Sequence, residues 1–383
     1  MHICRGQKIL VPAAIACLSY LVSCSSGIDS PGLEIASNRA GARGQVKTVR
    51  LVLVGTMSGS GSWRGRPARR GIEIARHVLD EREGPRIRLR VLDDRGDDRR
   101  STRLVRRAAG SRKTDAVVFA GPPRAVARAE SSLARSGIPA FLCYGDLEGA
   151  GRLTRHVFQM GPTFAREARL LVRDALRPRR GARLGALTED SVMGEVARAA
   201  LRNELEARHA RLVEARVFEP SGPQRMGRHL RKLRAAGVRR LFVEASPGEL
   251  GNMSAAFDRM GWEPSVFGFD LTLSPPYRGP APPQGAVAAD WFTRSAGARD
   301  SDRFSRFRKA SVTVTGGRPR RWEFRSYLAT LLAVRADRAG RASRRLERMR
   351  SERVAGVEVT LSRTDHLVPN ARDVRLWEMK DFR

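Results

Sequence analysis

Apolar and polar positions follow two patterns along this chain, one typical of buried strands and one typical of amphipathic helices. Residues 49–54 form an apolar run that only Arg50 interrupts, which suits a strand buried on both faces of a parallel sheet. Apolar residues then recur at helical spacing from 68 to 79, behind Pro67, which suits the first turn of a helix. In residues 86–94 apolar side chains alternate with arginines, which predicts a half-buried strand. The opening of the chain therefore predicts a β-α-β unit.

The alternation of strand and helix continues and then restarts. The further strands expected in the first series are residues 115–121 and 137–143. Those expected in the second series are residues 182–190, 212–218, 239–246 and 265–270. A long helix at about 325–339 and a final pair of strands near 356–380 complete the pattern. Short crossovers make such connections right-handed and the sheets parallel, so we predict an α/β protein with two doubly wound parallel-sheet lobes.

Two similar α/β units in tandem imply two lobes with a cleft between them. Ligands bind such sheets outside the carboxyl ends of the strands. The loops expected to line the cleft are residues 55–65, 121–125, 143–148, 188–194, 245–248 and 270–277.

The N-terminus has the pattern of an export signal. Two basic residues precede an apolar stretch at 9–22, which is about as long as a signal-peptide core and short for a membrane span. Residues 21–24, Leu-Val-Ser-Cys, resemble a bacterial lipobox, which predicts removal of residues 1–23 and lipidation of Cys24. Residues 25–47, rich in Ser, Gly and Ala, suit a flexible tether. An uncleaved anchor is the alternative. We expect an exported lipoprotein of the cell envelope that faces the periplasm or cell exterior.

Net charge is the most unusual feature of the composition. The 383 residues include 72 basic and 40 acidic side chains, for a formal charge of +32, and only six of the basic residues are lysine. Such a charge attracts nucleic acid or anionic lipid. The arginines are spread over nearly every expected helix rather than gathered in one patch, which favours a solvated surface over a nucleic-acid site. The hydrophobic content of 41% supports a folded core.

The glycine-rich loop after the first strand admits a nucleotide hypothesis. Gly59 and Gly61 fit a G-x-G-x-x-G loop, and Asp93 and Asp94 end the second strand. The third glycine position is Arg64, however, so the match is imperfect. We therefore expect no nucleotide and no other cofactor.

A second interpretation covers more of the chain. The segment "VRLVLVGTMSGSGSWRGRP", followed by "IRLRVLDDRGDD", resembles the opening of type I periplasmic binding proteins of the branched-chain amino-acid and amide-binding branch. Later blocks in the order and spacing of that family are "DAVVFAGPPRAVA", "SGIPAFLCYGD", "HVFQMGPTFAREA", "RLGALTEDSVMGE" and "PSVFGFDLT". The resemblance runs from about 48 to 380.

The resemblance implies two hinged lobes that close on a small solute, usually a zwitterionic amino acid, for delivery to an ABC transporter permease. The implied first lobe comprises residues 48–161 and 293–345, and the second comprises 162–292 and 346–383. The family places an aromatic residue of the first loop against the ligand, which is Trp63 here, beside Ser58 and Gly59. It places an acid that binds the ligand ammonium after the strand at 265–270, which is Asp270 here.

At three other positions the chain departs from the family. Pro123 and Arg124 replace a pair of hydroxyl residues, and Tyr144-Gly145-Asp146 replaces a run that donates to the ligand carboxylate. Met193 stands where an aromatic residue often covers the ligand. Arg124 would grip a carboxylate with two hydrogen bonds, and Asp146 would add an acceptor. We hypothesise a ligand with more polar or charged groups than an aliphatic amino acid, or a cleft that has lost ligand binding.

Nothing in the sequence indicates catalysis or a metal site. The six histidines show no metal-binding spacing, and Ser60 and Ser62 have no evident base partner. The acids of "DDRGDD" lack the spacing of a calcium loop. Without residues 1–23 the chain keeps only Cys24 and Cys143, so no disulfide is expected, and Cys143 fits a structural thiol.

We therefore expect a lipid-anchored solute-binding protein rather than an enzyme. The alternative is a ligand-poor envelope regulator or sensor ectodomain that uses the same fold to bind a partner. A repressor of the same fold would carry a DNA-binding helix-turn-helix before the lobes, where this chain has a signal peptide, so nucleic acid is not an expected partner.

Overall fold

The computed structural model describes residues 47–59, 61–147, 155–177, 182–220, 223–269, 287–290, 304–317, 320–337, 342–355, 357–361 and 375–378. Two sites expected from the sequence, the lipidated Cys24 and the ligand-binding Asp270, lie outside these residues.

The first sheet contains five parallel strands in the order β2-β1-β3-β4-β5. They are β1 (Thr48–Gly55), β2 (Arg86–Asp93), β3 (Ala116–Ala120), β4 (Ala140–Leu142) and β5 (Val157–Gln159). The strands expected at 49–54, 86–94, 115–121 and 137–143 are thus confirmed. The chain runs outward in one direction from β1 to β2 and in the other from β3 to β5. The crevice of such a sheet lies where the order reverses, at the carboxyl ends of β1 and β3.

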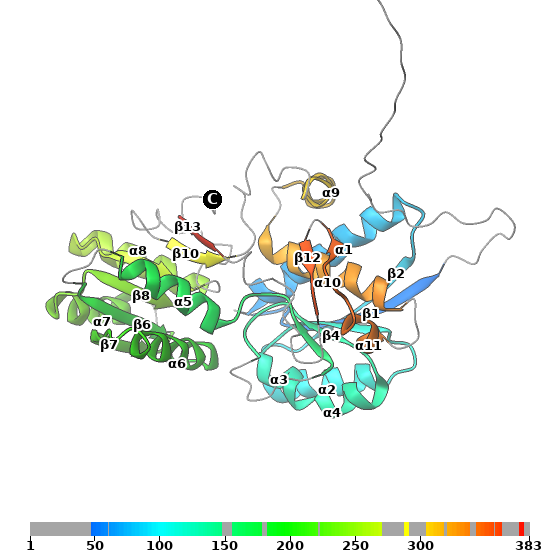
Figure 1. The fold of residues 1–383 in the computed structure, drawn as a ribbon, viewed down its shortest axis with the longest axis horizontal. Coiled ribbons are helices and arrows are strands. Elements are labelled where there is room, and N and C mark those ends of the chain that lie inside the picture. Colours follow the sequence, from blue (N-terminus) through cyan, green and yellow to red (C-terminus); the bar gives the residue numbers. More distant parts are fainter. Residues whose placement is uncertain are drawn as a thin grey trace, which may run out of the picture. The chain divides into compact units, whose positions relative to one another are not determined.

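Helices cover both faces of this sheet because successive β1 side chains point to opposite sides. Leu51 and Leu53 pack against α1 and α10, whereas Val52 and Val54 pack against α2, α3 and α4. Figure 1 shows α2, α3 and α4 together on one side, and α1 and α10 on the other. The bounds are α1 Ser62–Asp80, α2 Asp98–Ala109, α3 Pro123–Arg128, α4 Glu130–Ser136 and α10 Arg321–Asp337. The apolar run from Leu51 to Val54 in β1 follows from this double burial.

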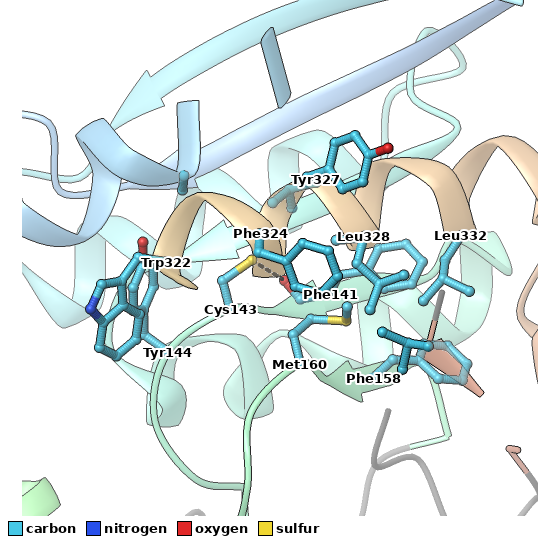
Figure 2. Packing of buried hydrophobic residues seen from close by; sticks show 14 of the residues in the cluster. Phe141, Cys143, Tyr144, Phe158, Met160, Trp322, Phe324, Tyr327, Leu328 and Leu332 are labelled. Carbon is cyan, nitrogen blue, oxygen red and sulfur yellow. Dashed lines mark hydrogen bonds between the residues drawn. The ribbon is translucent and has the colours of Figure 1, made fainter. Parts of the chain in front are cut away.

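Helix α10 returns late in the sequence to the core of the first sheet, where it crosses α1 closely. A Cβ atom at Gly71 would lie 2.0 Å from the Glu323 carbonyl oxygen and 2.1 Å from Ser326 Oγ, so the crossing requires glycine. On its inner side α10 brings Phe324 and Leu328 into the cluster of Figure 2, with Phe141 of β4. Helix α9 (Ser305–Thr315) also packs on α1.

The second sheet repeats the topology of the first. Its order is β13-β10-β9-β8-β6-β7, in which β6 to β10 have the same relative order as β1 to β5. The strands are β6 (Leu184–Glu189), β7 (Leu212–Phe218), β8 (Arg240–Glu244), β9 (Ser265–Gly268), β10 (Val287–Asp290) and the antiparallel edge strand β13 (Arg375–Glu378). The crevice of this sheet lies at the carboxyl ends of β6 and β8.

Helices also cover both faces of the second sheet. Ala186 of β6 packs in one cluster with Leu201 of α6, and Leu187 packs in the other with Leu230 of α7. The helices are α5 (Phe164–Ala175), α6 (Val192–Glu206), α7 (Pro223–Ala235) and α8 (Pro247–Met260). The two-sheet α/β architecture expected from the alternating pattern is confirmed.

Several local expectations were wrong. Helix α1 begins at Ser62, so Pro67 lies inside the helix rather than in its first turn. Between β3 and β4, where the alternation of strand and helix predicts one helix, the chain forms two, α3 and α4. The strands near the C-terminus do not pair with each other: β12 (Val357–Val359) pairs with β11 (Glu352–Val354), and β13 pairs with β10. The short helix α11 (Ala342–Leu346) precedes this hairpin.

Candidate functional site

A pocket of about 180 Å³ lies at the carboxyl ends of strands from both sheets. The first sheet contributes Trp63 and Arg64 after β1, the turn after β3, and Tyr144 after β4. The second sheet contributes Glu189 at the end of β6, Met193 on α6 and Glu244 at the end of β8. Asp98, Gly121, Pro122, Pro123, Arg124, Gly145, Ser191, Val192, Ala245 and Ser246 complete the lining. The pocket thus joins the two crevices that the strand orders define.

Two aromatic rings, those of Trp63 and Tyr144, line one side of the pocket, and the ring of Trp322 packs against both. The Tyr144 ring stacks on Trp322 of α10 with 4.5 Å between centroids, and Trp63 meets the Tyr144 ring edge-on at 6.1 Å. Figure 2 shows Tyr144 and Trp322 side by side. The Tyr144 hydroxyl is buried and, within the described part of the chain, has no hydrogen-bond partner. Burial raises the pKa of Tyr144 well above its ordinary value, so the hydroxyl stays neutral and can donate to a ligand.

Arg64 supplies a positive charge at the first turn of α1. Its guanidinium carbon lies 4.9 Å from the centroid of the Trp63 ring, and the side chain is half-buried. Burial lowers the pKa of Arg64 although Glu189, Asp94 and Glu244 oppose the change. The first turn of α1 holds no acidic residue that would neutralise the positive end of the helix dipole. Arg64 and the helix terminus together favour an anionic ligand group.

Two carboxyl groups face Arg64 from the second sheet. Glu189 is half-buried, and its Oε2 accepts a hydrogen bond from the Ser246 backbone at 2.8 Å. Glu244 is 3% exposed, and its Oε2 has no hydrogen-bond partner among the described residues. Burial, and next the charge of Glu189, raise the pKa of Glu244 to about 8 despite Arg64 and Arg198. Glu244 is therefore mainly protonated at neutral pH.

The glycine-rich opening loop is fixed by the paired acids of β2. Asp93 accepts from the Ser58 hydroxyl at 2.7 Å and from the Met57 backbone at 2.9 Å. Asp94 accepts from the Thr56 hydroxyl at 2.7 Å and from the Gly96 backbone at 2.8 Å. These carboxylates hold the loop, whereas the nucleotide hypothesis would use such an acid to bind a ribose.

The structure places Ser58 and Gly59 beside the pocket rather than in its lining. Both are exposed, and Gly59 adopts a φ of 70° that favours glycine. Trp63, four residues further on, does line the pocket.

Arg124 and Met193, which the sequence proposed as ligand contacts, both line the pocket. Arg124 Nη2 lies 3.1 Å from Glu195 Oε2, in an ion pair that joins α3 to α6. This partner competes with any ligand carboxylate for Arg124. Met193 packs near Gly145: a Cβ atom at Gly145 would lie 3.1 Å from the Met193 sulfur and 2.4 Å from Pro123 Cγ. Gly145, with a φ of 90°, thus permits both the turn and the close approach.

Asp146, which the sequence proposed as a ligand contact, instead binds the start of helix α5. Its side chain is 1% exposed and does not line the pocket. Its Oδ2 accepts a hydrogen bond from the Phe164 backbone at 2.5 Å, at the first residue of α5. A carboxylate at a helix N-terminus is stabilised by the unpaired backbone N–H groups there. Tyr144 and Asp146, adjacent to the same glycine, therefore point to different surroundings.

Sequence reasoning missed Arg64, Glu189 and Glu244 as site residues. Arg64 was considered only as a departure from a glycine motif. The two glutamates end buried strands that carry no other acidic residue, in "LGALTE" and "RLFVE". A charged residue at the carboxyl end of a buried parallel strand is a signal that would have found them.

The described residues show no arrangement for catalysis or metal binding. Among them, no three or more His, Cys, Asp or Glu side chains are grouped to hold a metal ion. Cys143 is buried and free of disulfides, and burial raises its pKa to about 12. Within the described part of the chain, no helix combines the length and hydrophobicity that a membrane span needs.

A pocket between the carboxyl ends of two similarly wound parallel sheets defines a two-lobed solute-binding protein. The chain belongs to the periplasmic binding protein family, whose sequence model matches residues 48–380, and the fold is that of its type I members. These are extracytoplasmic solute-binding proteins, not enzymes. No curated protein sequence matches the chain.

Solved structures share this fold at low sequence identity. A type 1 periplasmic binding protein from Bordetella pertussis is 16% identical with a TM-score of 0.73, over 87% of this chain and 96% of that chain. The LivJ branched-chain amino acid transporter substrate-binding protein from Streptococcus pneumoniae, in complex with isoleucine, is 15% identical with a TM-score of 0.70, over 85% and 94%. An ABC-transporter solute-binding protein from Rhodopseudomonas palustris, in complex with 3,4-dihydroxybenzoic acid, is 16% identical with a TM-score of 0.71, over 84% and 90%.

Proposed function

We propose that this protein is a lipid-anchored solute-binding protein that captures a small polar or amino-acid-like ligand and delivers it to an ABC importer. The observation that supports this most is the pocket itself, in which Arg64 and the buried Glu244 carboxyl place groups of opposite chemistry within one small volume. In the part of the chain that is described, neither the Arg64 guanidinium nor Glu244 Oε2 has a hydrogen-bond partner. Buried polar groups normally have such partners, and a bound solute would supply them.

The solutes of the structural relatives set the range of ligands to test. One relative was solved with isoleucine and another with 3,4-dihydroxybenzoic acid, and both carry a carboxylate. The pocket volume of about 180 Å³ suits molecules of that size and lies below the roughly 300–1,000 Å³ of pockets that take drug-sized ligands. The Trp63 and Tyr144 rings would pack against the apolar part of such a solute.

A thermal-shift screen tests solute binding directly. The purified full-length chain is heated with amino acids, amides, polyamines, short peptides and aromatic acids, and a ligand at 100 times its Kd should stabilise the protein by about 2.7 kcal/mol. The shift should fall in Arg64→Gln and persist in Arg69→Gln, whose side chain pairs with Glu73 on the exposed face of the same helix. An absence of any shift across the screen would contradict ligand capture.

The lipid anchor is a separate part of the proposal. Cys24 lies outside the described residues, and its support is the lipobox-like sequence that it ends. Two or three acyl chains hold a protein stably on a membrane. Cys24→Ser should therefore move the protein from the membrane fraction to the soluble fraction, with an unchanged fold by circular dichroism. Retention of the variant on the membrane would contradict lipidation at this residue.

An envelope regulator that binds a protein partner remains the alternative. The ion pair between Arg124 and Glu195 supports it, because Arg124 is then engaged at the rim instead of being open to a ligand. Neighbouring permease and ATPase genes would favour transport, and an isolated gene beside cell-wall enzymes would favour the regulator.

A further inference from the structure

Strand β7 forms an open edge of the second sheet. Within the described chain it pairs with β6 alone, and no strand lies along its other side. Val213 and Val217 on this strand are each 44% exposed, and they are two of the three large apolar residues that the described chain exposes. An open edge with apolar side chains is a template for pairing with another strand.

The other edges of the two large sheets are protected against such pairing. Strands β5 and β13 are short, with three and four residues. Strand β2 is longer, but Arg86, Arg88 and Arg90 share one face, so they would meet arginines of a second copy in an antiparallel pair. Like charges opposite each other destabilise a strand pair. Among these described edges, only β7 is long and lacks this repulsion.

The sequence of β7 is complementary to itself. Residues 212–218 read Leu-Val-Glu-Ala-Arg-Val-Phe, with Ala215 at the centre. When two copies of this strand run antiparallel about Ala215, Val213 faces Val217 of the second copy. In the same register Glu214 faces Arg216 of the second copy, and the twofold symmetry repeats each contact. Apolar pairs and opposite charges at such positions stabilise a pair of strands.

The backbone groups of β7 suit this register. The Phe218 carbonyl oxygen accepts a hydrogen bond from the Asp190 backbone at 2.7 Å, so it points toward β6. Directions alternate along a strand, so the N–H and C=O groups of Ala215 and Val217 point away from β6. Residues that face each other in a hydrogen-bonded antiparallel pair exchange these groups. Strand β7 has one extra residue before Glu214, after which its pairing with β6 is regular.

Charge selects this register among its neighbours. The side chains of Glu214 and Arg216 are 27% and 32% exposed, and they form an ion pair at 2.9 Å within one chain. A shift of two residues in one direction places Glu214 opposite its own copy, and the same shift in the other direction places Arg216 opposite its own copy. Like charges directly opposite each other are destabilising. A shift of one residue would set outward backbone groups opposite inward ones.

We propose that this protein forms a twofold homodimer in which β7 pairs antiparallel with β7 of a second copy, centred on Ala215. The pairing joins the second sheets of the two copies into one continuous sheet and brings Val213 and Val217 into contact across the interface. The four charges of Glu214 and Arg216 then alternate in sign around the twofold axis. The inference goes beyond solute capture, because it uses no residue of the pocket between the sheets and holds whether or not a solute binds.

Sedimentation velocity on the full-length chain tests the dimer. The net charge of +32 repels a second copy, so the salt concentration is kept at about 150 mM, where charges more than about 8 Å apart are screened. We expect the mass of two copies at about 100 µM protein. Ala215→Pro removes an N–H group that points outward, so it should keep the fold and lower the association constant at least about tenfold.

Charge reversal tests the register. Glu214→Arg and Arg216→Glu each place like charges opposite each other twice, so each variant alone should dimerise at least about tenfold more weakly. A mixture of the two variants restores opposite charges across the strands, and so does the double variant Glu214→Arg/Arg216→Glu. Both should dimerise like the wild-type chain. Damage to the fold of either variant would not be repaired by mixing.

A matched pair of variants separates this edge from exposed apolar surface in general. Val217→Ser should weaken the dimer, whereas Val312→Ser on α9, where the valine is 55% exposed, should leave it unchanged. Circular dichroism verifies the fold of each variant, and if Ala215→Pro does not fold, the mixing experiment decides.

Three results would overturn the proposal. They are a wild-type monomer at about 100 µM, a dimer that Ala215→Pro and the charge reversals leave unchanged, and a mixture of the two charge variants that stays monomeric. None of these results bears on solute capture, which the thermal-shift screen tests separately.

Discussion

Burial gives different properties to residues that look alike in the sequence. Asp93 and Glu244 both end a parallel strand next to the pocket, yet their environments differ. Asp93 accepts three hydrogen bonds, from Ser58, Met57 and Arg95, whereas Glu244 has an oxygen with no partner among the described residues. One acid is therefore stabilised as an anion that holds a loop, and the other as a neutral group available to a ligand.

Asp93 should contribute to stability in a pH-dependent way. Burial alone would raise its pKa, but the hydrogen bonds from Ser58, Met57 and Arg95 lower it below its value in an unfolded chain. A depressed pKa stabilises the fold above the unfolded value of 3.8, and this stabilisation is lost as the pH falls through the lower folded value. Asp93→Asn should therefore lower the Tm at pH 6 and match the wild-type chain more closely at pH 3.

The control for this prediction is Asp80→Asn at the end of α1. The Asp80 carboxylate is 50% exposed and lies 3.6 Å from Arg76. Exposed pairs of this kind contribute about 0–1 kcal/mol, so the Tm should change little at either pH. An equal loss for Asp93→Asn at pH 6 and pH 3 would contradict the role given to its charge.

Cys143 should be chemically inert in the folded protein. It is fully buried after β4, and burial raises its pKa to about 12 although Arg325 opposes this. The thiolate is the reactive form, so almost none is present at pH 8.5. Iodoacetamide followed by peptide mass mapping should modify Cys143 at least about tenfold more slowly in the native chain than in urea. Equal rates in both states would show that the thiol is accessible.

At the scale of the elements, close helix packing depends on single glycines. Gly71 on α1 faces the Glu323 carbonyl of α10, and Gly194 in the first turn of α6 faces the Glu189 carbonyl. At each glycine a Cβ atom would lie only 2.0 Å from that carbonyl oxygen. The first contact fixes α10 on the core of the first sheet. The second brings the start of α6, with Met193, against the strand end that carries Glu189. Helix packing and pocket geometry are therefore coupled at these residues.

Gly71→Ala should destabilise the protein. The added methyl group must displace backbone atoms of α10, and overpacking of this kind typically costs about 1–3 kcal/mol. Thermal unfolding followed by circular dichroism should show a clear drop in Tm. Gly248→Ala is the matched control, because Gly248 lies in helix α8 with nothing within 4 Å of its Cβ position. That variant should be neutral or slightly stabilised, and an equal drop in both would contradict the packing argument.

The sequence predicted the elements that follow the alternation of strand and helix and missed those that depart from it. A buried strand such as β1 is recognised by its apolar run, and a helix such as α6 by apolar residues at helical spacing. Strands β5 and β10 follow β4 and β9 with no helix described between them, so the alternation of strand and helix does not predict them. Neighbouring strands supply their hydrogen bonds. Trp63 was named as a site residue from the resemblance to the family, and it lines the pocket from the first turn of α1. The surroundings of Asp146 and Glu244 depend on α5 and β6, distant in sequence, so their separate environments could not be predicted.

For the whole molecule, the main question is what the excess positive charge does. The described ion pairs use some arginines, among them Arg50 with Asp115, Arg208 with Glu204 and Arg335 with Glu352. The net charge of +32 nevertheless leaves many without an acidic partner. Basic residues occur on elements of both sheets, from α2 to α7, rather than along one groove. A dispersed charge attracts polyanions without positioning them, so specificity resides in the pocket.

Salt should therefore separate the two kinds of binding expected of this molecule, non-specific attraction of polyanions and solute binding in the pocket. Binding of a fluorescent DNA duplex to the full-length chain should be independent of sequence, and a protein that contacts 6–10 phosphates loses about 10³–10⁵ in affinity between 50 and 200 mM salt. Solute binding in the pocket should change by less than about threefold over the same range, because groups shielded from solvent are screened much less. Fluorescence anisotropy with two unrelated duplexes, beside calorimetry with the solute, measures both effects. DNA binding that survives 200 mM salt and distinguishes the two duplexes would mean that the arginines form a recognition surface.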